Sequence, residues 1–141
     1  MGKSDLEYKF LNLWLTLTDL PEPQHDYRFV AEEIVGLGPG IRKRLQEAGL
    51  KDWKFDWAWP ECKVAVELEG GIWSGGRHVR GKGYEDDCIK YNYARSKHWS
   101  VYRFTSGMLE RDLAACIDQV AAALGGGERL PFDDIEFEKE E

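Results

Sequence analysis

The sequence predicts a small α/β domain in which helices flank a mixed β-sheet. Two seven-residue segments, 53–59 and 63–69, alternate apolar and polar side chains and are separated only by residues 60–62, which is typical of a β-hairpin. A third strand-like segment, 99–104, stands between two helix-like segments. The order of helices, hairpin, helix, strand and helix is that of a small α/β domain.

The segments before the hairpin are predicted to be helical. Leu, Phe and Trp recur at helical spacing over 6–17, and Pro21 ends this amphipathic helix. Residues 27–35 are ambiguous, and we prefer a short helix there. Glycines predict a turn at 36–40, followed by a helix at 41–48.

The segments after the hairpin begin with a loop. Glycines and basic residues over 70–83 predict no regular structure. Residues 84–97 are acidic at their start and basic at their end, as the dipole of a helix favours. The strand at 99–104 follows, and an alanine-rich helix at 109–124 ends at three glycines.

At 141 residues the chain is long enough for one domain with a hydrophobic core. We assign residues 1–127 to this domain and expect the acidic tail at 128–141 to be disordered. No segment approaches the ~20 apolar residues that span a bilayer. The N-terminus does not resemble a signal peptide, so we expect a cytoplasmic protein with no membrane partner. Three widely spaced cysteines predict neither a disulfide framework nor a zinc site.

The formal net charge of −7 argues at first against a nucleic-acid partner. Its distribution weakens that argument, because much of the negative charge lies in the tail. Between Arg77 and Arg103, basic residues outnumber acidic ones. Net charge therefore excludes no class of partner.

The predicted hairpin gathers three acidic side chains on one face. Asp56 faces Glu67 across the ladder, and Glu69 lies one step further along the same face. The opposite face is apolar, with Trp53, Phe55, Trp57, Trp59, Val64, Val66 and Leu68. Like charges opposite each other destabilise a ladder, so a bound divalent cation is the interpretation we favour. An ordinary charged face, in which Lys54 pairs with Glu69, is the alternative.

Paired carboxylates suit phosphodiester hydrolysis. Mg²⁺ and Mn²⁺ prefer oxygen ligands, activate water and stabilise charge on a phosphate. We expect Asp56, Glu67 and Glu69 to bind such an ion, with the carbonyl of Leu68 as a further ligand. Lys90 lies on a stripe of the next helix from which its ammonium could reach the cluster, unless that stripe is simply solvated.

The loop after the hairpin is suited to phosphate contact. Its glycines permit the close approach of a backbone, and basic side chains follow them. The residues that we expect to contact DNA here are Arg77, His78, Arg80 and Lys82. An ordinary solvated loop is the alternative.

These residues, in this order, resemble the PD-(D/E)XK nuclease superfamily, and most closely its small members of the very-short-patch-repair and phage-encoded types. The likeness rests on FDWAWPE with VELEGG (55–71), GRHVRGKGYEDDCIKYN (76–92) and WSVYRFT (99–105). It implies a restriction-endonuclease-like fold. It also implies a metal-dependent endodeoxyribonuclease that acts in phage or mobile-element DNA processing, repair or recombination.

The resemblance implies roles for single residues. Asp56 and Glu67 match the acids that bind the metal. The superfamily lysine would fall at Glu69. Either Glu69 itself acts as a ligand or base, or Lys90 from the following helix replaces that lysine. We favour Glu69 as ligand or base with Lys90 as the supporting cation. An acid from the N-terminal region often completes such a site, and the candidates are Glu7, Asp26, Glu32 and Glu33. Because double-strand cleavage usually requires two active sites, we also consider a homodimer.

Residues 34–50 resemble a helix-hairpin-helix element, in which a glycine turn presents backbone N–H groups to a phosphate. Arg42, Lys43 and Arg44 follow the turn and are expected to contact phosphate. A glycine turn that serves packing alone is the alternative. For the whole chain, a non-catalytic DNA-binding module is the second function, and a protein-interaction domain with an acidic tail is the third.

Overall fold

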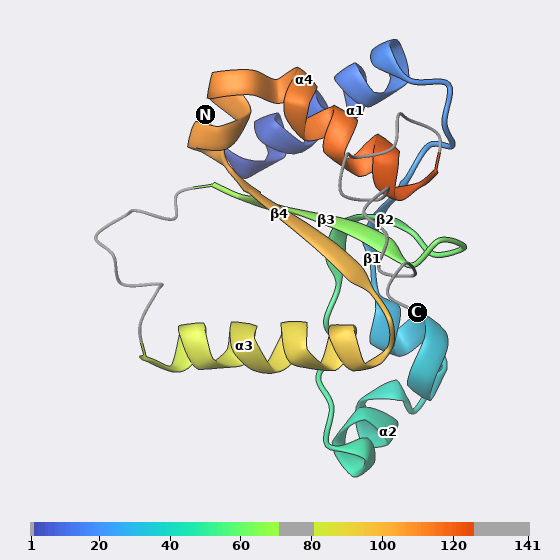
Figure 1. Cartoon of the computed structure of the whole chain (residues 1–141). Coiled ribbons are helices and arrows are strands. Elements are labelled where there is room, and N and C mark those ends of the chain that lie inside the picture. Colours follow the sequence, from blue (N-terminus) through green and yellow to red (C-terminus); the bar gives the residue numbers. More distant parts are fainter. Residues whose placement is uncertain (1, 71–80, 126–141) are drawn as a thin grey trace, which may run out of the picture.

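The chain folds into a four-stranded sheet between two helical layers (Figure 1). The computed structural model describes residues 2–70 and 81–125. Its elements are α1 (Lys3–Leu17), β1 (Gln24–Tyr27), the π-helix η1 (Ala31–Val35), α2 (Ile41–Ala48), β2 (Phe55–Trp59), β3 (Val64–Glu69), α3 (Gly81–Ser96), β4 (Ser100–Thr105) and α4 (Ser106–Ala123). The predicted α/β class is confirmed. The predicted DNA contacts Arg77, His78 and Arg80 and the tail at 128–141 lie outside the described residues.

The sheet is mixed, as predicted, with the strand order β1-β2-β3-β4. β2 is antiparallel to both β1 and β3. β4 is parallel to β3, with pairs running from Val64↔Ser100 to Glu69↔Thr105. Parallel neighbours need a long crossover, and α3 lies within the segment that joins these two strands.

The predicted hairpin register is confirmed. Trp59 pairs with Val64 and Trp57 pairs with Val66. The Cys62 N–H donates to the Trp59 carbonyl at 3.0 Å, and Lys63 adopts a positive φ of 56°. The short linker closes into a tight turn, and that turn sets which residues face each other.

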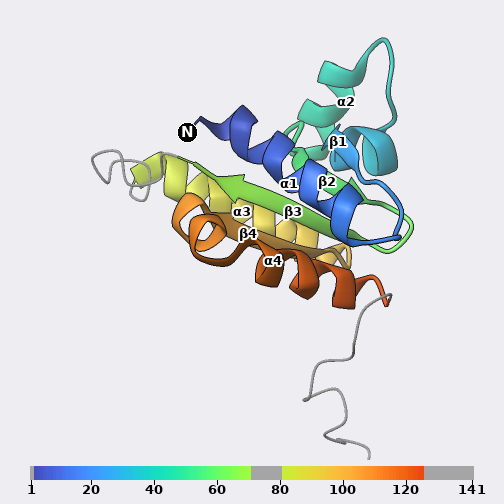
Figure 2. The ribbon, with the colours of Figure 1, turned by 90° about the horizontal axis from the view of Figure 1, so that it is seen from above.

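The helices α1 and α4 cover one face of the sheet, as both views show (Figure 1, Figure 2). Leu6, Phe10 and Trp14 recur every four residues, so they share one face of α1, and all three are buried. They pack with the apolar face predicted for the hairpin. The sheet and α4 contribute Trp57, Trp59, Val64, Val66, Leu68, Phe104, Leu109, Cys116, Ile117, Val120 and Ala121.

Two indoles attach α1 to the sheet through one carbonyl. The Nε1 atoms of Trp14 and Trp59 both donate to the carbonyl of Pro21, at 2.9 and 2.7 Å. The two rings lie 4.7 Å apart between centroids. The loop after α1 is therefore held against the end of the hairpin.

The second face of the sheet is also buried, which corrects the prediction of a polar surface there. α3 lies along this face in Figure 1, with η1 beside its C-terminal end and α2 further from the sheet. Ala58 and Ala65 are small, so the aromatic residues of this layer approach the strands closely. The layer consists of Tyr27, Phe29, Val30, Leu45, Phe55, Ala58, Ala65, Ala94 and Trp99.

Phe55 lies in this second layer, although strict alternation predicted it on the face of Trp57. Its ring stacks on Phe29 with centroids 4.2 Å apart and contacts Trp99. Side-chain alternation along β2 therefore breaks between Phe55 and Trp57, and Asp56 stands at the break.

Strand β1 was not predicted. Its sequence, Gln24-His-Asp-Tyr27, has no apolar alternation, and only Tyr27 of the four is buried. Such a short polar strand at the edge of a sheet gives little signal. Three helices also begin earlier than predicted, at Lys3, Gly81 and Ser106.

No disulfide joins Cys62, Cys88 and Cys116, and Cys116 is the buried one of the three. Within the described residues, no helix combines the length and apolar character that crossing a membrane requires.

One pair of substitutions tests which helical face forms the core. Ile117→Ala on α4 should lower the free energy of unfolding by about 2–5 kcal/mol, because it leaves a cavity among fully buried side chains. Ile89→Ala on the exposed face of α3 should change it by no more than about 0.5 kcal/mol. Urea denaturation of both variants measures the difference. Equal losses would contradict this assignment of layers.

Candidate functional site

The site lies where β2 and β3 part. Strand pairs run from Trp59↔Val64 to Trp57↔Val66. Beyond them, two carboxylates span the gap. The N–H of Asp56 donates to Oε2 of Glu67 at 2.9 Å, and the N–H of Leu68 donates to Oδ2 of Asp56 at 2.8 Å. Each carboxylate thus accepts a hydrogen bond from a backbone N–H of the opposite strand, in the place of a carbonyl oxygen of the ladder.

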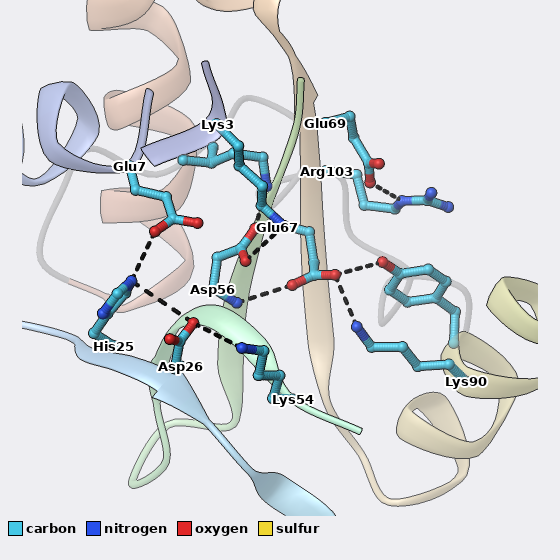
Figure 3. A network of polar contacts seen from close by, with 12 residues as sticks. Lys3, Glu7, His25, Asp26, Lys54, Asp56, Glu67, Glu69, Lys90 and Arg103 are labelled. Carbon is cyan, nitrogen blue, oxygen red and sulfur yellow. Dashed lines mark hydrogen bonds and ion pairs between the residues drawn. The ribbon is translucent and has the colours of Figure 1, made fainter. Parts of the chain in front are cut away.

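Both carboxylates are buried, with residue exposures of 3% for Asp56 and 8% for Glu67. A buried charge is costly unless it is paired and hydrogen-bonded. Glu67 meets this need through α3: Lys90 Nζ and the Tyr91 hydroxyl donate to its Oε1 at 2.8 and 2.7 Å (Figure 3). The predicted approach of Lys90 to the acidic residues is confirmed.

Tyr91 is a fixed donor in this network. Burial, the charge of Glu67 and the hydrogen bond to it raise the pKa of the Tyr91 phenol far above its ordinary value. The hydroxyl therefore keeps its proton at neutral pH and holds one oxygen of Glu67 in place.

Lys3 occupies the other side of the pair. Its Nζ lies 3.0 Å from Oδ1 of Asp56. Partial burial lowers the pKa of this ammonium, but the hydrogen bond to Asp56 and the charges of Asp56, Glu67 and Glu7 outweigh that effect, so the pKa is raised. The negative charges of Asp56 on β2, Glu67 on β3 and Glu7 on α1 thus all stabilise the charged form of Lys3.

Asp56 holds its proton more tightly than an ordinary aspartate. Burial is the largest cause and the charge of Glu67 adds to it, while the Leu68 N–H and Lys3 act in the opposite direction. The net effect raises the pKa of Asp56 above 3.8. Burial and the charge of Glu67 thus outweigh the Leu68 N–H and Lys3 in their effect on the pKa of Asp56.

Glu7 is the one of the four candidate N-terminal acids that lies buried beside the pair. It is 8% exposed and accepts from His25 Nε2 at 2.7 Å. The His25 ring lies against Trp57, with centroids 4.5 Å apart. Because α1 carries both Lys3 and Glu7, the same helix reaches Asp56 on β2 and His25 on β1 (Figure 3).

The other three candidates are less buried than Glu7. Asp26 is exposed, and its Oδ1 lies 3.7 Å from His25 Nε2 and 3.5 Å from Lys54 Nζ. Glu33 contacts Lys63 and accepts from the Tyr27 hydroxyl at 2.7 Å. Glu32 is exposed on η1.

Glu69 does not join the pair, which corrects the predicted cluster of three carboxylates. Its Oε2 accepts from Arg103 Nε on β4 at 2.8 Å. In residues 2–70 and 81–125, no three His, Cys, Asp or Glu side chains are arranged so that they could hold a metal ion as placed. Leu68 contributes its N–H to Asp56, and a ligand role for its carbonyl stays a prediction.

The predicted DNA contacts that the structure describes lie on helices. Lys82 is in the first turn of α3 rather than in a loop, 3.4 Å from Asp86. Arg42 and Lys43 are exposed on α2, where Lys43 lies 3.9 Å from Glu47.

Arg44 was expected to contact phosphate, but it faces inward. Its guanidinium donates to the carbonyls of Val35, Pro39 and Gly36 at 2.7, 2.8 and 2.6 Å, and to that of Leu37 at 3.2 Å. These carbonyls all point toward one side chain. In a planar trans peptide the next N–H points the opposite way. The N–H groups of Leu37, Gly38 and Gly40 therefore point away from the Arg44 guanidinium.

The turn owes its shape to three glycines in left-handed or related conformations, with φ of 91°, 96° and 83° at Gly36, Gly38 and Gly40. Residues other than glycine rarely adopt these backbone angles. The turn and the adjacent Arg42 and Lys43 are exposed, and successive backbone N–H groups in such a turn can suit an anion.

Comparison with protein-family models, with curated proteins and with solved structures found no match. Membership of the PD-(D/E)XK superfamily, the restriction-endonuclease-like fold and any activity are therefore proposals that rest on the site itself.

Sequence reasoning missed Lys3, His25 and Tyr91. Lys3 and Glu7 are four residues apart at the start of a helix, a spacing that places them on one face. Nothing in the sequence indicated that this face would meet the hairpin. His25 was unremarkable because the strand that carries it was not predicted.

Asp56→Asn tests the electrostatics of the pair. The raised pKa means that the folded protein gains stability from protonated Asp56, and this gain is fully present below about pH 4 and lost as pH rises through the folded pKa. Asn keeps an oxygen for the Leu68 N–H and carries no charge. The free energy of unfolding of Asp56→Asn minus that of wild type should therefore become more positive from about pH 4 to about pH 7.

Urea denaturation at both pH values measures this difference. Asp118→Asn, an exposed position on α4, is the matched control and should show a smaller change with pH. A difference for Asp56→Asn that stayed flat or fell with pH would contradict the assigned burial and repulsion.

Arg44→Lys tests the inward role of Arg44. Lysine lacks the planar fork that reaches several carbonyls, so we expect a loss of about 1–2 kcal/mol in the free energy of unfolding. Arg42→Lys, two residues away and exposed, should be nearly neutral. Chemical denaturation of both variants decides the matter, and equal effects would refute the inward role.

Proposed function

We propose that this protein is a metal-dependent endodeoxyribonuclease that hydrolyses DNA phosphodiester bonds with Mg²⁺ or Mn²⁺, in phage or mobile-element DNA processing, repair or recombination. One observation carries the proposal. The buried Asp56 and Glu67 lie side by side where β2 and β3 separate, and the negative charges around them stabilise the Lys3 ammonium. Such a point attracts cations.

The donor set fits a hard divalent cation. Carboxylate oxygens are the ligands that Mg²⁺ and Mn²⁺ prefer, and the Asp56 and Glu67 pair supplies them. The partners of the pair differ in how readily they can leave. The Lys3 side chain is 51% exposed, whereas that of Lys90 is 13% exposed. Exchange of Lys3 for a metal at Asp56 Oδ1 therefore needs only that one lysine turn into solvent.

A bound metal ion would supply an activated water and positive charge at the phosphate. Asp56 and Glu67 would hold it, with Glu7 fixed nearby by His25. Lys90 and Tyr91 orient Glu67, and the Lys90 ammonium adds positive charge beside the pair. Of the two replacements considered for the superfamily lysine, the contacts favour Lys90, because Glu69 is engaged with Arg103.

DNA contact is assigned to the glycine turn. The N–H groups of Leu37, Gly38 and Gly40, which point away from Arg44, and the basic side chains of Arg42 and Lys43 suit a backbone phosphate. Cleavage of both strands of a duplex would require two active sites. The homodimer therefore stays a prediction that rests on this requirement alone.

A non-catalytic DNA-binding module is the second candidate. One observation favours it: each oxygen of Asp56 and Glu67 already has a protein donor or cation as partner. In that case the pair only joins β2 to β3, and the glycine turn binds DNA without cleavage.

Cleavage assays separate the two candidates. Wild-type protein should cleave plasmid, linear or branched DNA with Mg²⁺ or Mn²⁺ and not with EDTA. Asp56→Asn and Glu67→Gln should each reduce the rate at least about a hundredfold, because each removes a ligand charge without a change of shape. Glu110→Gln, an exposed position on α4, is the control and should leave the rate unchanged.

The outcomes are distinct. Wild-type protein that binds DNA equally with and without EDTA and never cleaves it would select the binding module. Cleavage that persisted in both Asp56→Asn and Glu67→Gln would refute the site.

A further inference from the structure

An open groove of about 410 Å³ runs between the end of α3 and β4. Tyr91 and Arg95 line it from the helix, and Val101 and Arg103 line it from the strand. β4 is the last strand of the sheet, and no other described strand pairs with its outer side. The groove thus borders an open sheet edge.

The charged side chains that line the groove are both arginines. The Arg103 guanidinium lies over the Tyr91 ring, 4.2 Å from its centroid, and its Nε is bonded to Glu69. One face of this guanidinium is therefore supported by an aromatic ring. Arg95 is exposed one helical turn beyond Tyr91. Arginine recognises phosphate through its planar fork and stacks on flat rings.

The groove adjoins the carboxylate pair through Tyr91. The same side chain that lines the groove donates its hydroxyl to Oε1 of Glu67 at 2.7 Å. One side chain, Tyr91, therefore separates the groove from the carboxylate pair.

We infer that this groove binds an unpaired segment of DNA, with Arg95 and Arg103 on its phosphates, and this inference rests on the proposed nuclease function. The volume is that of a pocket for one small ligand, such as a nucleotide. An unpaired base can lie on a guanidinium or ring, whereas the bases of a duplex are already stacked inside it. The substrate would then be single-stranded DNA or a junction that carries an unpaired strand.

Two other occupants are possible in chemical terms. A peptide strand could pair with the open edge of β4, and the acidic segment 128–141 carries charge opposite to the arginines. Two arginines beside an aromatic ring, next to a pair of acids suited to phosphodiester hydrolysis, favour the nucleic acid.

Fluorescence anisotropy in EDTA tests the inference without cleavage. The probes are a labelled single strand of mixed sequence and the blunt duplex formed with its complement. The single strand should bind more tightly than the duplex. Arg95→Glu should weaken single-strand binding about tenfold, and each lost phosphate contact should reduce the salt dependence of log Kd by about 0.7.

Lys9→Glu is the matched control, because it makes the same charge change at an exposed position on α1, in the opposite helical layer. It should weaken binding less than about twofold at moderate salt. Circular dichroism and thermal unfolding establish that both variants are folded.

Equal effects of Arg95→Glu and Lys9→Glu, or tighter binding of the duplex, would overturn the inference. A second result would also overturn it: a synthetic peptide of residues 128–141 loses affinity on Arg95→Glu, whereas DNA binding is unchanged by this substitution. The groove would then be assigned to the acidic tail. Arg95-dependent binding without any Mg²⁺-dependent cleavage would leave the groove standing and remove only the nuclease proposal. If Arg95→Glu cleaved single-stranded and duplex DNA at the wild-type rate, the nuclease proposal would stand and the proposed role of the groove would be overturned.

Discussion

Two like charges buried side by side determine the arrangement around them. Asp56 and Glu67 replace backbone bonds where β2 leaves β3, and neither charge is tolerable there without partners. The partners come from outside the hairpin: Lys3 from α1, and Lys90 and Tyr91 from α3. The helices on opposite faces of the sheet are thus joined electrostatically through its middle.

Much of the fold follows from local signals. The three-residue linker fixed the hairpin register, and the glycines on either side of 41–48 marked both ends of α2. β1 could not be found in this way, because its order comes from pairing with β2 rather than from its own polar residues. The burial of the second face was hidden for a similar reason. Ala58 and Ala65 suit a solvent-facing strand as well as a tightly covered one.

The site was predictable only in part. Asp56, Glu67 and Lys90 come together as their spacing indicated, since the hairpin and the stripe on α3 are local features. Glu69 turns to Arg103 because β4 pairs in parallel with β3, and the register of a parallel pair has no local signature. Lys3, Glu7 and His25 reach the pair through long-range packing, which periodicity alone does not reveal.

The shared carbonyl of Pro21 has a consequence for the integrity of the whole site. Trp14 and Trp59 attach α1 to the hairpin there, and the same helix carries Lys3 and Glu7 at its other end. Any local opening that frees α1 would withdraw the neutralising lysine and expose two repelling carboxylates at once. Opening of the helix and loss of the charged centre should therefore be a single cooperative event rather than gradual fraying.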